Sequence, residues 1–117
     1  MQKIYYLSSC DTCKKIIKEI NPSKEVEIQD IKIQNIDEVT LDWLKEKVGS
    51  YEELFSKRAI KFRSLGYSEM KLTDLDYRKL ILEEYTFLKR PFIINGESVF
   101  IGNAKKDVQA AKESFSK

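Results

Sequence analysis

The first 33 residues place a helical pattern between two extended patterns, and this order restricts the topologies open to the chain. The apolar run at 4–7 predicts a strand buried on both faces. Helical spacing then predicts an amphipathic helix over 11–20, ended by Asn21-Pro22. The apolar positions are Cys13, Ile16, Ile17 and Ile20 in the helix, and Val26, Ile28, Ile31 and Ile33 in a second extended segment with roughly alternating burial. Two strands this close along the chain predict a parallel pair with a right-handed crossover.

The last quarter of the chain has a different pattern. The apolar runs 92–94 and 98–101 flank Asn95-Gly96, and an Asn-Gly step between two such runs predicts a β-hairpin. Asn103 is then expected to cap a final helix. The residues expected on the inner face of this helix are Ala104, Val108, Ala111 and Phe115.

The middle of the chain is predicted to be helical. Thr40 and Thr73 are expected to cap two helices, Gly49 to end the first of them, and the capping-box spacing at 50–53 to start a short helix between them. Gly66 is expected in a turn. The inward residues are expected to be Leu41, Leu44 and Val48 in the first helix, and Leu75, Leu80, Ile81 and Phe87 in the last.

The element order is therefore β-α-β, three helices, β-β and α. A parallel pair joined to an antiparallel hairpin, with helices on both sides, is a thioredoxin-like α/β arrangement with an inserted helical subdomain. We expect one domain over 1–117, with the thioredoxin-like core at about 1–35 and 88–117 and the helical insert at about 36–87.

Composition excludes several classes of function. The chain has 117 residues, 21 basic and 19 acidic, with a net charge of +2, so nothing in its charge favours direct binding to nucleic acid. It has no histidine, which excludes Ser-His and Cys-His nucleophile pairs and His-ligated metals. A structural zinc site is not expected, because Cys10 and Cys13 have no second pair of thiols or imidazoles to complete a tetrahedron. No export signal or membrane span is recognised, and a cytoplasmic location is expected.

Cys10 and Cys13 form a C-x-x-C motif between the first predicted strand and the first helix. The free N–H groups and the dipole of a helix start favour a thiolate at Cys10, and Lys14 and Lys15 add positive charge. The alternative is that both cysteines are only small buried apolar residues. The motif after a strand favours the redox interpretation for Cys10. Cys13, one turn further, fits either a resolving thiol or the apolar helix face.

Two basic clusters accompany this motif. In Lys89-Arg90-Pro91, a proline that opens the hairpin strand is consistent with a cis bond, and Arg90 could lie near the thiol, where a guanidinium lowers a thiol pKa and binds oxyanions. The other cluster contains Lys57, Arg58 and Lys61. For Lys57, Lys61 and Lys89 we favour ordinary surface ion pairing.

Three segments carry a resemblance: CDTCKK, SKRAIKFRSLG and FLKRPFIINGESVFIG. In this order and spacing, over nearly the whole chain, they resemble the arsenate reductase (ArsC)/Spx family of the thioredoxin-like superfamily. The resemblance implies that Cys10 is the nucleophile and that Arg90 holds the oxyanion or stabilises the thiolate. Arg58 matches the position of the arginine in the family's middle segment. With a shift of two residues, Ser56 occupies that position instead. The candidate catalytic residues are therefore Cys10, Cys13, Arg58 and Arg90, and the candidate substrate-binding residues in the same motifs are Thr12, Lys14 and Pro91.

The chain also departs from the glutaredoxin-linked arsenate reductases. Their third arginine, after the hairpin, is replaced by Gly102, and they lack a cysteine at the position of Cys13. Both features look more like Spx and the glutathione-linked reductase-like branch, although the glycine on the polymerase-facing surface of Spx is Ser50 here. The unrelated phosphatase-type arsenate reductases need a C-x5-R loop, and Ile16 at the sixth position after Cys10 excludes that mechanism.

Two functions follow from the resemblance. The first is an oxidoreductase whose Cys10 thiolate attacks arsenate or a small-molecule or protein disulfide, with Cys13, glutathione or glutaredoxin as the resolving thiol and no bound cofactor. The second is a Spx-like regulator that binds RNA polymerase and uses Cys10 and Cys13 as a redox switch. Turnover with a thiol donor distinguishes the two.

Overall fold

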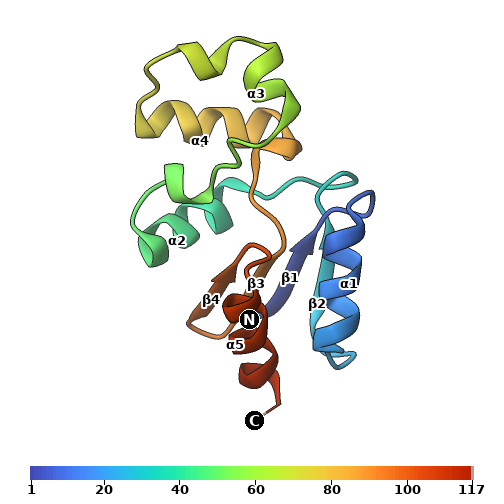
Figure 1. Cartoon of the computed structure of the whole chain (residues 1–117). Coiled ribbons are helices and arrows are strands. Elements are labelled where there is room, and N and C mark those ends of the chain that lie inside the picture. The colour runs from blue at the N-terminus through green and yellow to red at the C-terminus, as the bar shows by residue number, and fades with distance from the viewer. Residues whose placement is uncertain (117) are drawn as a thin grey trace. The chain divides into compact units, whose positions relative to one another are not determined.

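The computed structural model describes residues 1–116 (Figure 1). Contacts divide the chain into two compact units. We call Met1–Gln34 together with the chain from Arg90 onward the sheet unit, and Asn35–Lys89 the helical unit. The sheet unit contains β1 (Gln2–Tyr6), α1 (Asp11–Ile20), β2 (Glu27–Asp30), β3 (Phe92–Asn95), β4 (Ser98–Ile101) and α5 (Lys105–Phe115). The helical unit contains α2 (Glu38–Val48), α3 (Ile60–Ser64), α4 (Asp74–Glu83) and the 3₁₀ turns η1 (Glu52–Leu54), η2 (Tyr67–Glu69) and η3 (Tyr85–Phe87).

The sheet has the strand order β2-β1-β3-β4. β1 pairs with β2 in parallel, with Ile4 opposite Ile28, and pairs with β3 antiparallel, with Ile4 opposite Ile93. β3 and β4 form the antiparallel hairpin. The predicted parallel pair, the hairpin and the thioredoxin-like α/β arrangement are therefore confirmed.

One face of this sheet is covered by α1 and α5. An aliphatic cluster fills the space between the sheet and the two helices: Ile4, Ile16, Ile20, Val26, Ile93, Val108 and Ala111. Full burial of an aliphatic side chain contributes about 1.5–3 kcal/mol. The bounds of α1 are those predicted, and its buried residues Cys13, Ile16 and Ile20 lie on the predicted apolar face. This packing fixes α1, and with it the C-x-x-C motif, against β1.

The helical unit is built around aromatic rings and one polar network. Phe55 is 1% exposed, stacks on Phe87 with ring centroids 4.9 Å apart, and makes edge contacts with Phe62 and Tyr77. The polar network centres on the carboxylate of Asp42, which accepts hydrogen bonds from the guanidinium of Arg78 and from the hydroxyl of Tyr51. These side-chain contacts connect α2, α4 and the segment around η1.

Two predicted helix caps are wrong. Asp37, not Thr40, caps α2: its carboxylate accepts the N–H of Thr40 at 2.9 Å, so the helix begins three residues earlier than the Thr40 cap required. Asn103 is not the cap of α5, which Ala104 precedes directly. The caps at Thr73 and Gly49 are confirmed, Thr73 with a complete capping box. Asp, Asn, Ser and Thr all cap helices, so a neighbouring candidate of the same class can take the position.

Some predicted inward residues point to solvent. Leu75 is 72% exposed because α4 buries the face of Tyr77, Leu80 and Ile81, and a position two residues before Tyr77 lies on the opposite side of a helix. Ile33 is 85% exposed because β2 ends in a turn, in which the carbonyl of Asp30 accepts the N–H of Ile33. Three smaller differences concern Ile28, which is 44% exposed, Ala104, which is exposed, and Phe87, which is buried but lies in η3 after α4 has ended.

The hairpin turn is shifted by one residue from the predicted Asn-Gly step. Asn95 pairs with Ser98 in the ladder, so the two turn residues are Gly96 and Glu97. Gly96 has φ +64°, a left-handed value that glycine adopts without steric cost. A glycine in the first turn position therefore gives the predicted hairpin with a different turn register.

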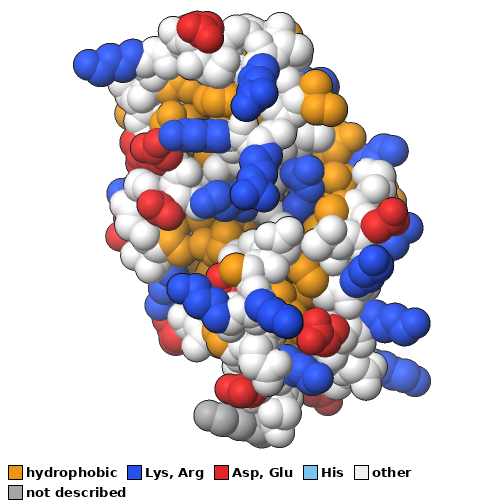
Figure 2. All heavy atoms as spheres, viewed as in Figure 1, with side chains coloured by type: hydrophobic (Ala, Val, Ile, Leu, Met, Phe, Trp, Pro, Cys, Tyr) orange, Lys and Arg blue, Asp and Glu red, His pale blue; other side chains and the backbone are white. Residues whose placement is uncertain are grey.

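Charge is mixed on the surface. Figure 2 shows Lys and Arg side chains spread over the face in view, with Asp and Glu among them. The predicted surface ion pairs are present for Lys57 with Glu52 and for Lys61 with Glu84. No helix in the described part of the chain, 1–116, is long and apolar enough to cross a membrane.

Candidate functional site

Cys10 lies immediately before α1, in the cap position of that helix. Its N–H donates to the carbonyl of Leu7 at 2.9 Å, which closes a turn directly after β1. Its own carbonyl accepts the N–H of Lys14 at 3.2 Å, the first bond of the helix. The side chain is therefore held where the first backbone N–H groups have no partner within the helix. Cys10 is partly exposed and is not in a disulfide.

The environment of Cys10 favours the thiolate. Partial burial raises the pKa of the Cys10 thiol. The opposing effects are together larger: the backbone N–H and the thiol of Cys13, and the guanidinium of Arg90, all lower this pKa. The net pKa of Cys10 is therefore below its ordinary value. The thiolate is the nucleophilic form of cysteine. The lowered pKa means that a larger share of Cys10 is in this form at a given pH.

Cys13 has the opposite character although its sulfur lies beside that of Cys10. It is 1% exposed on the inner face of α1. Burial has the largest effect and raises the pKa of Cys13, a hydrogen bond with the Leu7 backbone lowers it, and the hydrogen bond and negative charge of Cys10 raise it again. With a small lowering by Arg90, the pKa of Cys13 is about 11. Cys13 is therefore a protonated thiol that can donate a hydrogen bond to a neighbouring thiolate.

Arg90 is brought to Cys10 by the sheet. Phe92 at the start of β3 pairs with Tyr5 of antiparallel β1, so the residues before Phe92 lie next to the residues that follow β1. The Arg90–Pro91 peptide bond is cis, and the carbonyl of Pro91 accepts the N–H of Gly102 at 2.9 Å. The guanidinium acts on the Cys10 thiol both by charge and by a hydrogen bond. The structure thus brings together Cys10, Cys13 and Arg90 of the predicted set.

Asp30 is a residue of this site that the sequence analysis missed. Its carboxylate accepts the N–H of Ser8 at 3.2 Å and that of Lys32 at 3.1 Å. The hydroxyl of Ser8 also binds it and is the main reason that the pKa of Asp30 is below its ordinary value. Asp30 pairs with Tyr6 in the parallel ladder, so its side chain reaches the loop that leads to Cys10. The available signal was an Asp at the carboxyl end of the second of two parallel strands, where loop and site residues gather.

The remaining predicted residues have the following positions. Thr12 and Lys14 are exposed on the first turn of α1, and Pro91 is buried before β3. Arg58 is exposed in the helical unit, between η1 and α3. The roles assigned to these four residues stay predictions.

Comparisons with known proteins agree with this fold. The model of the ArsC family matches residues 5–111. An uncharacterized protein from Haemophilus influenzae is 29% identical over 113 residues, which cover 95% of this chain and 98% of that protein.

Solved structures have the same fold. A protein named YFFB matches with a TM-score of 0.78 and 23% identity, over 95% of this chain and 98% of that one. An arsenate reductase (ArsC) related protein from Brucella melitensis matches with a TM-score of 0.68 and 24% identity, over 93% of this chain and 92% of that one. At these identities the structures show the thioredoxin-like fold, whereas the family match extends over the C-x-x-C motif and the Arg-Pro step. The chain belongs to the ArsC family.

Proposed function

We propose that this chain is a thiol-based oxidoreductase in which the Cys10 thiolate attacks arsenate or a disulfide. The observation that carries the proposal is the juxtaposition of three groups: a Cys10 thiol with a lowered pKa, the Arg90 guanidinium acting on it, and the protonated Cys13 thiol beside it. A nucleophile, a fixed positive charge and a second thiol are the components that two-electron reduction by thiols requires.

With a disulfide substrate, the Cys10 thiolate forms a bond to one substrate sulfur and the other leaves as a thiolate. Cys13 then loses its proton and attacks the sulfur of Cys10, which forms the Cys10–Cys13 disulfide and releases the second substrate thiol. With arsenate, Cys10 bonds to arsenic and an arsenate oxygen leaves as water. Attack by Cys13 or glutathione on the sulfur of Cys10 then breaks the sulfur–arsenic bond, and its electron pair stays on arsenic. In both cases two thiols are oxidised to one disulfide, which glutathione or glutaredoxin reduces.

The other predicted residues act around this step. Arg90, and Arg58 by family resemblance, neutralise the charge that develops on the substrate. Thr12, Lys14 and Pro91 contact the substrate next to Cys10. We place the reaction in the cytoplasm, a reducing compartment that keeps cysteines as free thiols.

The test is steady-state turnover of arsenate, and separately of hydroxyethyl disulfide, with glutathione plus glutaredoxin. We expect turnover of at least one substrate, complete loss of it in Cys10→Ser, and a slower reaction or a changed donor requirement in Cys13→Ser. Turnover that survives in Cys10→Ser would contradict the proposal. Turnover of the disulfide without turnover of arsenate would identify a disulfide as the substrate class.

A second candidate function is a Spx-like redox switch that binds RNA polymerase. Two features favour it: a second thiol in contact with Cys10, and Gly102, with φ +83°, at the position of the third arginine of arsenate reductases. The test is co-purification with RNA polymerase before and after oxidation with diamide, together with the turnover assay. Binding that changes with oxidation, without turnover, would support the regulator. Turnover without binding would exclude it.

A further inference from the structure

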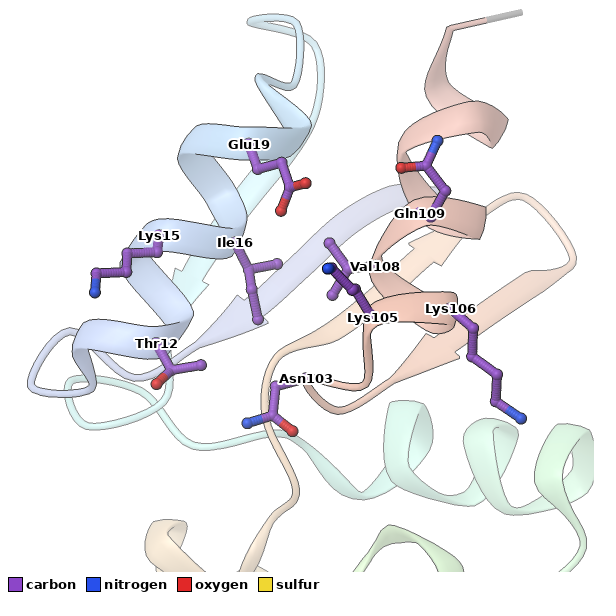
Figure 3. Close-up of a pocket in the computed structure, with 9 residues that line it drawn as sticks. All are labelled: Thr12, Lys15, Ile16, Glu19, Asn103, Lys105, Lys106, Val108 and Gln109. Carbon is purple, nitrogen blue, oxygen red and sulfur yellow. The ribbon is translucent and has the colours of Figure 1, made fainter.

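A groove lies between α1 and α5 of the sheet unit, next to the first turn of α1. It has a volume of about 470 Å³ and is lined by nine residues of the two helices and of the loop before α5. Figure 3 shows Ile16 of α1 and Val108 of α5 facing each other across it. This volume is within the range of about 300–1,000 Å³ that ligand sites occupy.

The groove combines an apolar floor with polar ends. Ile16 and Val108 belong to the buried aliphatic cluster under the helices and form the floor. At the end near the start of α1 lie Thr12 and Asn103 (Figure 3). At the other end, Glu19 extends from α1 toward α5 (Figure 3). An apolar floor with hydrogen-bonding groups at both ends suits a peptide segment better than an inorganic oxyanion, which has no apolar surface to bury.

The charge of the lining is mostly positive. It contains three lysines, Lys15, Lys105 and Lys106, and one acidic residue, Glu19. In Figure 3 the side chain of Lys105 lies beside Val108, whereas Lys15 and Lys106 point outward from the rim. Lys105 is therefore placed to pair with an anionic group in the groove, and Lys15 and Lys106 add positive charge at its rim. The lining therefore favours an occupant with negative charge.

The position of the groove connects it to the cysteines. Thr12, at one end, is the residue between Asp11 and Cys13 in the C-x-x-C motif. From Thr12 to Glu19 the helix rises by about 10 Å, the length of about three residues of extended peptide. A segment of that length in the groove would have one end beside the first turn of α1, where Cys10 lies.

We propose that this groove binds an acidic peptide segment next to the disulfide of a peptide or protein substrate. The inference rests on the proposed function and names its substrate class. The segment lies along the floor with its carboxylates near Lys105, and the adjacent disulfide reaches Cys10. The Cys10 thiolate then bonds to the sulfur of the bound peptide, and the other half of the disulfide leaves as a thiolate.

The experiment uses two peptides of equal length, Glu-Glu-Leu-Cys and Lys-Lys-Leu-Cys, each blocked at both ends and joined through its cysteine to nitrothiobenzoate. Attack on the peptide sulfur releases the coloured nitrothiobenzoate, so stopped-flow absorbance gives the second-order rate constant for the reduced full chain. At low salt we expect the acidic peptide to react about tenfold faster than the basic one, and the difference to shrink at high salt.

Variants locate the effect. Lys105→Glu should remove most of the preference for the acidic peptide, whereas Lys112→Glu, an equal charge change on α5 outside the groove lining, should keep it. Gln109→Trp, at an exposed lining position, should block the groove and slow the acidic peptide. Hydroxyethyl disulfide, which is small and neutral, should react equally with all these variants. Circular dichroism checks that each variant is folded.

Three results would overturn the inference. The first is equal rates for the two peptides, which would show that there is no preference for acidic segments. The others are equal effects of Lys105→Glu and Lys112→Glu, and a preference that persists in Gln109→Trp, because each would reduce the preference to an effect of general surface charge. If hydroxyethyl disulfide still reacts at Cys10 in those cases, the proposed function stands without the groove. If no disulfide reacts at Cys10 at all, the proposed function fails first and the inference falls with it.

Discussion

The sheet unit and the helical unit hold their residues in place by different means. In the sheet unit, backbone ladders set the positions: Cys10 follows β1 by one turn, and Arg90 precedes the antiparallel partner strand β3. In the helical unit, side chains make the main connections, through the rings around Phe55 and the bonds to Asp42. The difference teaches where substitutions should matter, because a ladder does not depend on one side chain, whereas each connection in the helical unit does.

The largest effect is expected at Phe55, the centre of the ring cluster. Phe55→Ala removes contacts with three rings at a fully buried position and should lower the free energy of unfolding of the helical unit by about 3–5 kcal/mol. Trp43, the single tryptophan, lies in α2 and reports urea unfolding of this unit by fluorescence. Tyr67→Ala is the matched control, since Tyr67 is half-buried and, within the described residues, its ring makes one edge contact, with Phe87. Equal losses of unfolding free energy in the two variants would contradict the central role of Phe55.

The next effect concerns the two candidate catalytic arginines, Arg90 in the sheet unit and Arg58 in the helical unit. Arg90→Ala should raise the pKa of Cys10 and slow its alkylation by iodoacetamide at pH 7 by about three- to tenfold, because the thiolate loses a neighbouring positive charge. Arg90→Lys should restore part of the rate but not the forked geometry. Arg58→Ala, with the same change in charge, is expected to have the smaller effect. If Arg58→Ala moves the pH profile of alkylation and Arg90→Ala does not, the order of the two arginines is wrong.

A smaller effect is expected at the helix caps, where Thr73 and Thr40 of the helical unit should respond differently to substitution. Thr73→Ala should cost about 1 kcal/mol, because the Thr73 hydroxyl accepts the N–H of Asp76 at the start of α4. Thr40→Ala should change little, because the N–H of Thr40 remains bound to Asp37. The Trp43 fluorescence of both variants in urea measures the difference. A larger loss of unfolding free energy in Thr40→Ala than in Thr73→Ala would indicate that Thr40 caps α2 after all.

The smallest effect is expected at Asp42, whose pKa is held below its ordinary value by Arg78 first and by Tyr51. For a carboxyl with a lowered pKa, the stabilisation is present above its ordinary pKa of about 3.9 and is lost as pH falls through the lower folded value. Asp42→Asn should therefore lower the free energy of unfolding by at most about 1 kcal/mol at pH 7, since the pair is partly exposed, and by less below about pH 4. Glu25→Gln, at an exposed position of the sheet unit, is the control. A difference that does not change with pH would contradict the ionic explanation.

Local patterns in the sequence predicted the parts of the fold that depend on local chemistry. The bounds of α1, the hairpin and the Thr73 cap follow from spacing and turn residues within a few positions. The error at Thr40 arose because Asp37, a residue of the same capping class, occupies the cap position of α2. At α5 the cap position falls on Ala104, which makes no side-chain cap bond, so a rule based on capping residues could not find it. The error at Leu75 arose because an apolar residue can be placed on either face when a helix is short.

The site was predictable in part. Cys10 and Cys13 are recognisable because the motif and the helix start are contiguous in the chain. The approach of Arg90 depends on the pairing of Tyr5 with Phe92, which lie 87 positions apart by their numbers, so family resemblance was the stronger guide to it. Asp30 was missed because its contact with Ser8 depends on the register of β1 and β2, which no local pattern specifies.

The burial of Cys13 against Cys10 has a consequence for chemical damage. Peroxide converts an exposed thiolate to a sulfenic acid, and a second equivalent takes it irreversibly to a sulfinic acid. With a protected thiol already in contact, the sulfenic acid at Cys10 can condense to a disulfide before that second equivalent arrives, with water as the leaving group. Once a thiol donor reduces that disulfide, the chain would return to its starting state, and Cys13 would in this way protect Cys10 from irreversible oxidation.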